Sequence, residues 1–106
     1  MNSMEKIKQF INDRNWGQYH NEKDLALSIT LEASELLELF QWKTAEEGRK
    51  DTERLKEELA DVIIYSYQMA DKLGFDVDEI IAEKLVKNAE KYPIEKVLAE
   101  NAKNQE

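Results

Sequence analysis

The sequence predicts an all-α protein built as a four-helix bundle. Its 106 residues include three glycines and one proline, the residues that most often interrupt helices. Charged residues make up 36% of the chain, and apolar residues recur at spacings of three and four, the period of an amphipathic helix. A chain of this length can form one domain with a single core. We therefore expect a helical domain over residues 1–93, followed by a polar tail over residues 94–106.

The first helix is predicted over residues 3–14. Ser3 is a suitable residue to cap its first turn. Ile7, Phe10 and Ile11 then follow at helical spacing and give the helix one apolar side. This side is expected to face the core.

The next segment, NWGQYHNEK, is predicted to be a loop, because a glycine and two asparagines interrupt the helical pattern. Its ring-bearing residues Trp16, Tyr19 and His20 are candidates for ligand contacts, since a rigid scaffold can aim such groups from a loop. Two other interpretations stay open. Trp16 could fold over the core as a lid, and His20 could serve only as a structural hydrogen-bonding group.

The second helix is predicted over residues 23–42, and the third over residues 52–73 with Gly74 as its C-terminal stop. Between them, Thr44 is expected to cap a short helical turn in the connector TAEEGRKD. Trp42 stands at the end of the second helix. It is either a binding group or an ordinary anchor in the core.

The fourth helix is predicted to begin near Asp76, which resembles a capping box together with Glu79, and to end before Pro93. Its C-terminal half gathers three lysines and an asparagine in an otherwise acidic chain. Lysines stabilise the negative end of a helix macrodipole, but this effect does not explain the asparagine. The alternative is that these side chains bind phosphate and hydroxyl groups; they are Lys84, Lys87, Asn88 and Lys91.

The middle of the third helix, VIIYSYQM, is apolar on almost every side. A helix of this kind is normally buried on several sides, and one four-helix chain of this size cannot cover it. We therefore expect self-association through Ile63, Ile64 and Tyr67.

The charge balance of the chain limits its partners. There are 15 basic and 23 acidic residues, so the net charge is −8, which argues against a nucleic-acid-binding surface. A nucleotide ligand remains compatible, because a divalent metal inverts the local field. The sequence contains no cysteine and no recognisable signal peptide or membrane span. We expect a cytoplasmic protein without nucleic-acid or membrane partners.

Two of the predicted helices each present a pair of carboxylates from an apolar face. Glu32 and Glu35 are three residues apart in the second helix, as are Glu58 and Asp61 in the third, and this spacing places each pair on one side. A buried carboxylate without a partner is costly and normally changes its pKa, forms an ion pair or binds metal. The repeated pattern is the strongest functional signal in the sequence.

Four carboxylates without cysteine, and with a single histidine in a loop, favour a hard cation such as Mg²⁺ or Mn²⁺. Bundles that bind two irons use Glu-x-x-His pairs, and neither pair here has that histidine. Mg²⁺ usually acts together with substrate phosphates. The simpler interpretation is two solvated acidic faces that form ion pairs with lysine or arginine.

Four stretches of the sequence resemble the MazG-like all-α nucleoside triphosphate pyrophosphohydrolases, and especially their dCTP pyrophosphatase-like branch. They are WGQYHNEKDLALS, EASELLELFQW, EELADVIIY and KLVKNAEKYP, and they cover residues 16–93. The two acidic motifs are specific to the superfamily when they occur together. The segments FQW and KNAEKYP narrow the resemblance to the dCTP pyrophosphatase-like branch. Many MazG-like proteins have a glutamate where this chain has Leu31, but members of the dCTP branch also lack it.

The resemblance implies a four-helix fold that assembles as a homodimer or homotetramer. It implies hydrolysis of a nucleoside triphosphate, dCTP or a modified dCTP, to the monophosphate and pyrophosphate. Glu32, Glu35, Glu58 and Asp61 would be the Mg²⁺ ligands, with Glu35 our choice of catalytic group that accepts the proton of the attacking water. The residues that fall on the family's nucleotide-binding motifs are Trp16, His20, Trp42, Tyr65, Lys84, Lys87, Asn88, Lys91 and Tyr92.

Two rival functions stay open. One is a related pyrophosphohydrolase that acts on a phosphoribosyl nucleotide of histidine biosynthesis with the same acidic helices. The other is a non-catalytic helical module that binds a nucleotide or a protein partner. The complete acidic quartet argues against the second, because a protein without catalysis could lose these costly groups.

Overall fold

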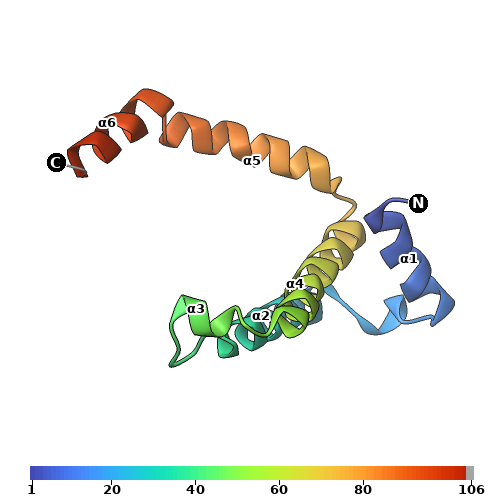
Figure 1. Cartoon of the computed structure of the whole chain (residues 1–106). Helices are drawn as coiled ribbons and strands as arrows, with labels where there is room; N and C mark the ends of the chain where they lie inside the picture. The colour runs from blue at the N-terminus through green and yellow to red at the C-terminus, as the bar shows by residue number, and fades with distance from the viewer. Residues whose placement is uncertain (105–106) are drawn as a thin grey trace. The chain divides into compact units, whose positions relative to one another are not determined.

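A computed structural model of the protein describes residues 1–104, and every regular element within them is a helix (Figure 1). This confirms the predicted all-α class. The chain divides into two compact units, Met1–Gly74 and the residues from Phe75 onward. The elements in order are α1 (Ser3–Asp13), the 3₁₀ helix η1 (Gly17–Tyr19), α2 (Glu22–Glu38), α3 (Ala45–Gly48), α4 (Thr52–Leu73), α5 (Val77–Lys91) and α6 (Ile94–Asn104).

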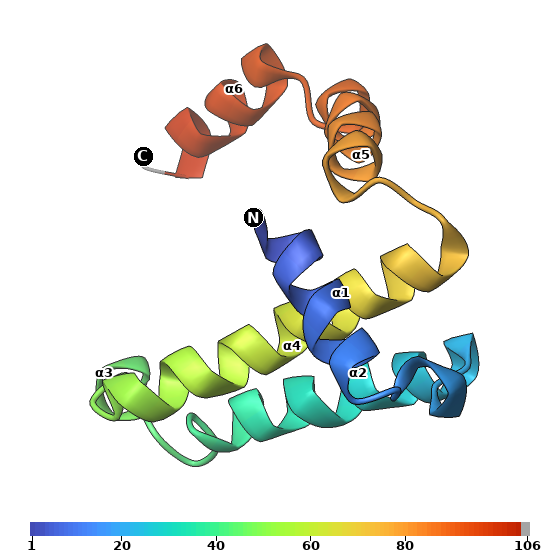
Figure 2. The same ribbon diagram turned by 90° about the vertical axis from the view of Figure 1, so that its right-hand side faces the viewer.

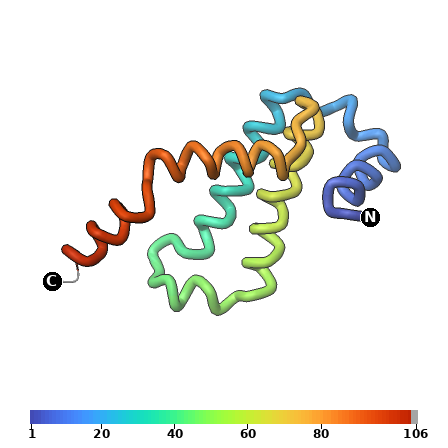
Figure 3. The backbone as a smooth tube through the Cα atoms, turned by 90° about the horizontal axis from the view of Figure 1, so that it is seen from above, coloured from blue at the N-terminus to red at the C-terminus, as the bar shows by residue number. Residues whose placement is uncertain are grey.

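The first unit is organised around α2 and α4. These two helices lie side by side and run in opposite directions, joined through α3 at one end (Figure 2). α1 packs against α4, beside the C-terminal half of that helix (Figure 3). The most deeply buried apolar residues of the unit are Leu25 and Leu39 on the α2 side and Ala70 on α4.

The predicted ends of α4 are correct. The helix runs from Thr52 to Leu73, and Gly74 adopts a left-handed conformation with φ 74° that ends it. The predicted cap of α1 is wrong by one residue. Ser3 is the first residue of the helix, and the side chain of Asn2 accepts the hydrogen bond from the backbone N–H of Glu5 at 2.9 Å. Asparagine at this position satisfies one of the free amides of the first turn.

The prediction that the second helix continues to Trp42 is wrong, because α2 ends at Glu38. The backbone amides of Leu39 and Phe40 donate to carbonyls three residues earlier, at 3.3 and 2.9 Å, and this tightens and ends the helix. Trp42 then takes a left-handed conformation with φ 62°. Thr44 caps α3 as predicted, in a capping box with Glu47.

The second unit consists of α5 and α6. Asp76 caps α5 as predicted, with its side chain accepting from the backbone N–H of Glu79 at 2.9 Å, and α5 ends at Lys91. The segment predicted to be a polar, mobile or weakly helical tail is helical over Ile94–Asn104, which is α6. Ile94, Val97 and Leu98 recur at spacings of three and four, which gives this segment an apolar stripe. The last part of the predicted tail, 105–106, lies outside the described residues.

A close contact between α3 and the end of α2 gives a stability prediction. Gly48 is buried, and a methyl group added at its Cα would overlap the ring of Phe40. We expect Gly48→Ala to lower the free energy of unfolding by about 1–3 kcal/mol, the usual cost of overpacking a core. Urea unfolding of the variant tests this. Gly17→Ala is the control, because its added carbon would lie 3.7 Å from Ile11, an ordinary contact.

Candidate functional site

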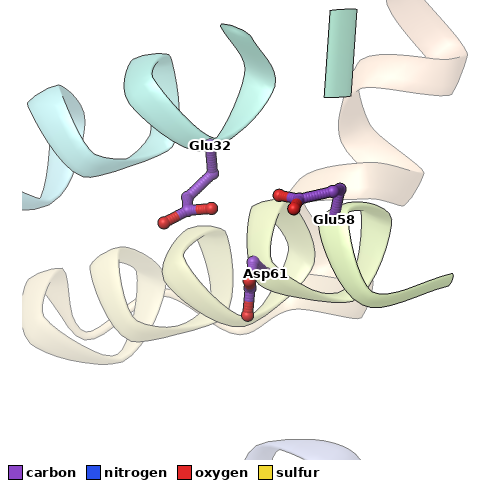
Figure 4. Close-up of side chains that lie close together, drawn as sticks. All are labelled: Glu32, Glu58 and Asp61. Atoms are coloured by element: carbon purple, nitrogen blue, oxygen red, sulfur yellow. The ribbon is translucent and has the colours of Figure 1, made fainter. Parts of the chain in front are cut away.

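Three carboxylates from α2 and α4 meet where the two helices pack. One oxygen from each of Glu32, Glu58 and Asp61 lies within 4.8 Å of the other two, and we call these residues the acidic cluster. Figure 4 shows Glu32 extending from α2 towards α4 and the carboxylate of Glu58 pointing from α4 towards Glu32, with Asp61 one turn further along α4. The predicted convergence of the two acidic pairs is therefore present for these three residues.

The position of Glu32 follows from the packing of α2. Leu25, Glu32 and Leu39 are seven residues apart, and residues at this spacing lie on the same side of a helix. Both leucines are buried, with 1% and 5% of their surface exposed. Glu32 is thus held in the interface with α4, between two core residues. The solvated acidic face considered above does not describe this glutamate.

The acidic cluster contains two buried oxygen atoms without a hydrogen-bond partner among the described residues. They are Oε2 of Glu32 and Oε2 of Glu58. A compensating charge comes from Arg54, whose Nε lies 3.9 Å from the other carboxylate oxygen of Glu58. Unpaired carboxylate oxygens are costly inside a protein unless a proton or a cation satisfies them. Converging, partnerless oxygens fit a hard divalent cation.

The pKa of Glu32 is raised from 4.5 to about 7, first by burial and then by the nearby carboxylates of Glu35, Asp61 and Glu58. Burial and the neighbouring Glu35 also raise the pKa of Glu58, against the opposing effect of Arg54. Without a cation, Glu32 and Glu58 therefore keep their protons to a higher pH than isolated glutamates do.

Glu35, the fourth predicted ligand, lies beside the acidic cluster on the more exposed side of α2. Its carboxyl group is close enough to those of Glu32 and Glu58 to form a hydrogen bond when one of the pair is protonated. Glu35 is not among the three residues whose oxygens converge. Its place at the rim suits a group that contacts water.

A cavity of about 630 Å³ adjoins the acidic cluster and lies between α1, η1 and α4. Asp61 belongs both to the cluster and to the cavity wall. Aromatic and aliphatic side chains form most of this wall, which is typical of a site for a flat organic ligand. The lining residues are Lys6, Ile7, Phe10, Ile11, Trp16, Tyr19, His20, Asp61, Ile64, Tyr65 and Gln68.

Trp16 is held in the cavity wall by its neighbours. Its ring meets that of Phe10 edge to face, with 5.8 Å between the centroids. The guanidinium of Arg14 lies 3.6 Å from the centre of the Phe10 ring and 5.9 Å from that of Trp16, and it donates to the carbonyl of Phe10. The indole is 44% exposed, so it lines an open cavity and does not form a lid buried on the core.

The cavity contains three of the predicted nucleotide-binding residues: Trp16, His20 and Tyr65. Trp42 does not line it. The side chain of Trp42 is 94% exposed, which excludes the interpretation of this residue as a core anchor within the chain.

The other predicted nucleotide-binding residues belong to the second unit. Their spacings of three and four place the polar ones along one side of α5. Tyr92 follows the helix, and Lys91 Nζ lies 5.4 Å from the centre of its ring. These residues are Lys84, Lys87, Asn88, Lys91 and Tyr92.

The sequence reasoning missed the contribution of α1 and of the C-terminal half of α4 to the cavity. Ile7 and Phe10 were interpreted only as a core stripe. Ile64 was interpreted only as an association surface, and Gln68 was not considered. The sequence did contain a signal for the α4 side of the cavity, because Asp61, Ile64 and Gln68 are separated by three and four residues and so share one face of the helix.

None of the helices described within residues 1–104 is long and apolar enough to cross a membrane.

Comparisons with known proteins agree with this arrangement. The sequence pattern of the MazG-like family matches residues 27–106. The chain is 37% identical over 92 residues to dCTP pyrophosphatase 1 of Rattus norvegicus and 38% identical over 91 residues to that of Homo sapiens. These matches cover 81% and 80% of this chain, but only 54% of each relative, so the chain spans about half the length of those proteins.

A solved structure supports the same relationship. A pyrophosphatase from Archaeoglobus fulgidus DSM 4304 superposes with a TM-score of 0.79 at 36% sequence identity. The superposition covers 85% of this chain and 88% of that protein. The family pattern, the named relatives and the shared fold lead to one conclusion: the chain belongs to the MazG-like family.

Proposed function

We propose that the protein is a Mg²⁺-dependent nucleoside triphosphate pyrophosphohydrolase that produces a monophosphate and pyrophosphate. The observation that carries this proposal is the continuity between the acidic cluster and the aromatic cavity through Asp61. A nucleotide needs both surfaces at once, because its phosphates require cations and its base favours flat apolar contacts. Relatives named dCTP pyrophosphatase and a structural neighbour named as a pyrophosphatase support the same reaction.

The residues that would hold the metal are Glu32, Glu58 and Asp61, with Glu35 as a fourth carboxylate at the rim. All of them offer oxygen, which suits Mg²⁺ or Mn²⁺. When bound, the metal would neutralise the charge that develops on the phosphates and polarise the attacking water.

The side chains of the protein supply orientation and proton transfer. Water attacks the α-phosphorus, the bond to the bridging oxygen breaks, and pyrophosphate leaves. Glu35 is our candidate to accept the proton of this water, because it lies at the exposed edge of the acidic cluster. Trp16 and Tyr65 would hold the base and sugar, with His20 at the same wall.

Further contacts are proposed for the phosphates and the base. The ammonium groups of α5 suit the pyrophosphate, and Asn88 suits a sugar hydroxyl. Trp42 stays a predicted base contact, since its exposed indole is available to a ligand or a second chain. The residues proposed on and after α5 are Lys84, Lys87, Asn88, Lys91 and Tyr92.

The preferred substrate is proposed to be dCTP or a modified dCTP, in line with the names of the relatives. The active form is proposed to be a homodimer or homotetramer. Large apolar side chains remain exposed on both paired helices, among them Leu31 at 64%, Leu59 at 50% and Ile63 at 45%. A second copy of the chain would remove such surfaces from water. The mass of the active preparation by light scattering tests this assembly.

The test of the function is product analysis with Mg²⁺ across standard and 5-modified nucleoside triphosphates. We expect monophosphate and pyrophosphate in equal amounts, with cytosine deoxynucleotides hydrolysed fastest. Diphosphate with orthophosphate would contradict the proposed bond cleavage. A phosphoribosyl nucleotide of histidine biosynthesis as the best substrate would support the rival enzyme. Absence of turnover, with nucleotide binding retained, would support a non-catalytic module.

A further inference from the structure

Gln68 occupies the cavity wall on the same side of α4 as the metal-binding candidate Asp61. Asp61, Ile64, Tyr65 and Gln68 stand at positions i, i+3, i+4 and i+7, and all four line the cavity. The seven residues from Asp61 to Gln68 correspond to about 10 Å along the helix axis. This length is comparable to that of a nucleotide from its α-phosphate to the far edge of its base. With phosphates at the acidic cluster, the base edge would reach Gln68.

The side chain of Gln68 is half-buried, and its amide is not satisfied by the protein. Among residues 1–104, no hydrogen bond of the structure involves this amide. The apolar side chains of Ile7, Ile11 and Ile64 line the same cavity. In pockets of this kind, a few polar groups with free hydrogen-bonding capacity determine how a ligand is oriented.

We propose that Gln68 recognises the base by two hydrogen bonds to the edge of cytosine. Its amide oxygen accepts from the exocyclic amine, and its amide nitrogen donates to the adjacent ring nitrogen. This inference rests on the proposed function and adds a specificity-determining residue to it. Trp16 and Tyr65 contribute flat surfaces that tolerate any base, so stacking alone does not select cytosine.

The other polar groups of the cavity fit this edge less well. Lys6 only donates hydrogen bonds, and the Asp61 carboxylate belongs to the acidic cluster. Tyr19 is 69% exposed, which leaves its hydroxyl open to competition from water. His20 also lines the cavity, but the two nitrogens of an imidazole point in different directions and cannot both meet one base edge. The amide oxygen and nitrogen of Gln68 lie side by side in one plane, as this edge requires.

The test is a cycle of two changes, one in the protein and one in the substrate. The protein change is Gln68→Met, which keeps the length of the side chain and removes both hydrogen-bonding groups. The substrate change replaces the 4-amino group of dCTP by hydrogen. We expect Gln68→Met to raise the KM for dCTP about tenfold, the effect of losing two neutral hydrogen bonds, while kcat changes less than about twofold.

The second expectation is the coupling between the two changes. The parent protein should discriminate against the nucleotide that carries hydrogen in place of the 4-amino group by about threefold to tenfold, and Gln68→Met should show no discrimination. Gln9→Met is the matched control, because Gln9 is exposed on α1 and does not line the cavity. It should leave both KM values unchanged.

Each other outcome overturns the inference. Equal discrimination in the parent and in Gln68→Met would show that the amide does not contact the amine. A fall in kcat with unchanged KM would assign Gln68 to the integrity of the fold. In both cases the parent still hydrolyses dCTP, so the proposed function stands. A parent protein that hydrolyses no nucleotide would remove both the function and this inference.

Discussion

Glu58→Gln is expected to lower kcat for triphosphate hydrolysis at least about hundredfold, because it removes one of three converging carboxylates of the proposed metal site. Glutamine has nearly the same shape, but its neutral amide binds a hard cation far less well than a carboxylate does. The measurement is steady-state release of pyrophosphate at saturating nucleotide and Mg²⁺. Thermal stabilisation by Mg²⁺ should shrink in parallel, since both effects depend on the same bound ion.

The matched control is Glu57→Gln on the same helix. Glu57 is exposed and lies outside the acidic cluster, so its replacement makes the same chemical change without touching the site. We expect this variant to retain parental activity. Glu58→Gln should remain folded, because a neutral side chain relieves repulsion among Glu32, Glu35 and Asp61 in the metal-free protein. Full activity in folded Glu58→Gln would rule out its assignment as a ligand.

The parts of the fold that follow from local signals were predictable from the sequence. Both ends of α4 were predicted correctly, and the C-terminal end follows from Gly74, which provides the left-handed stop. The end of α2 was predicted too late, because the apolar periodicity continues past Glu38 into Leu39 and Phe40. Packing determines where α2 ends, because the ring of Phe40 lies against Gly48 of α3. Such a contact between separate segments leaves no periodic signal.

The candidate site likewise has one part that the sequence predicted and one part that it did not. The pairs Glu32–Glu35 and Glu58–Asp61 were visible as repeated spacings on apolar faces, and the antiparallel packing of α2 on α4 brings three of these carboxylates together. The contribution of Phe10 to the cavity depends on how α1 docks on α4, and the sequence of α1 alone does not contain that information.

The stability of the metal-free protein is expected to fall between pH 4.5 and about 7 through the effect of Glu32. The pKa of this carboxyl rises from 4.5 to about 7 on folding, so the folded state binds its proton more tightly than the unfolded state. The associated stability is complete below pH 4.5, is lost as the pH rises to about 7, and is absent above that value. The raised pKa of Glu58 acts in the same direction.

Other carboxylates titrate in this range, so the decisive quantity is the difference in unfolding free energy between the parent and Glu32→Gln, whose amide resembles the protonated acid. Measured with a chelator present, the parent should lose stability relative to the variant as the pH rises to about 7, and the difference should then stay constant. Glu38→Gln, an exposed position on the same helix, should show no such trend. If the difference in unfolding free energy from the parent followed the same pH dependence in Glu32→Gln and Glu38→Gln, it would contradict a buried, protonated Glu32.

Mg²⁺ should reverse this pH dependence, because the carboxylates must lose their protons to bind it. At a concentration about 100 times its Kd, the ion should raise Tm by roughly 10 °C above pH 7, and by much less near pH 5. The gain should be small in Glu32→Gln at every pH and complete in Glu38→Gln. At the acidic cluster, Mg²⁺ must displace the proton of Glu32, so its binding should strengthen as the pH rises through the pKa of this group. A gain in Tm that is equal at low and high pH would therefore show that Mg²⁺ binds elsewhere.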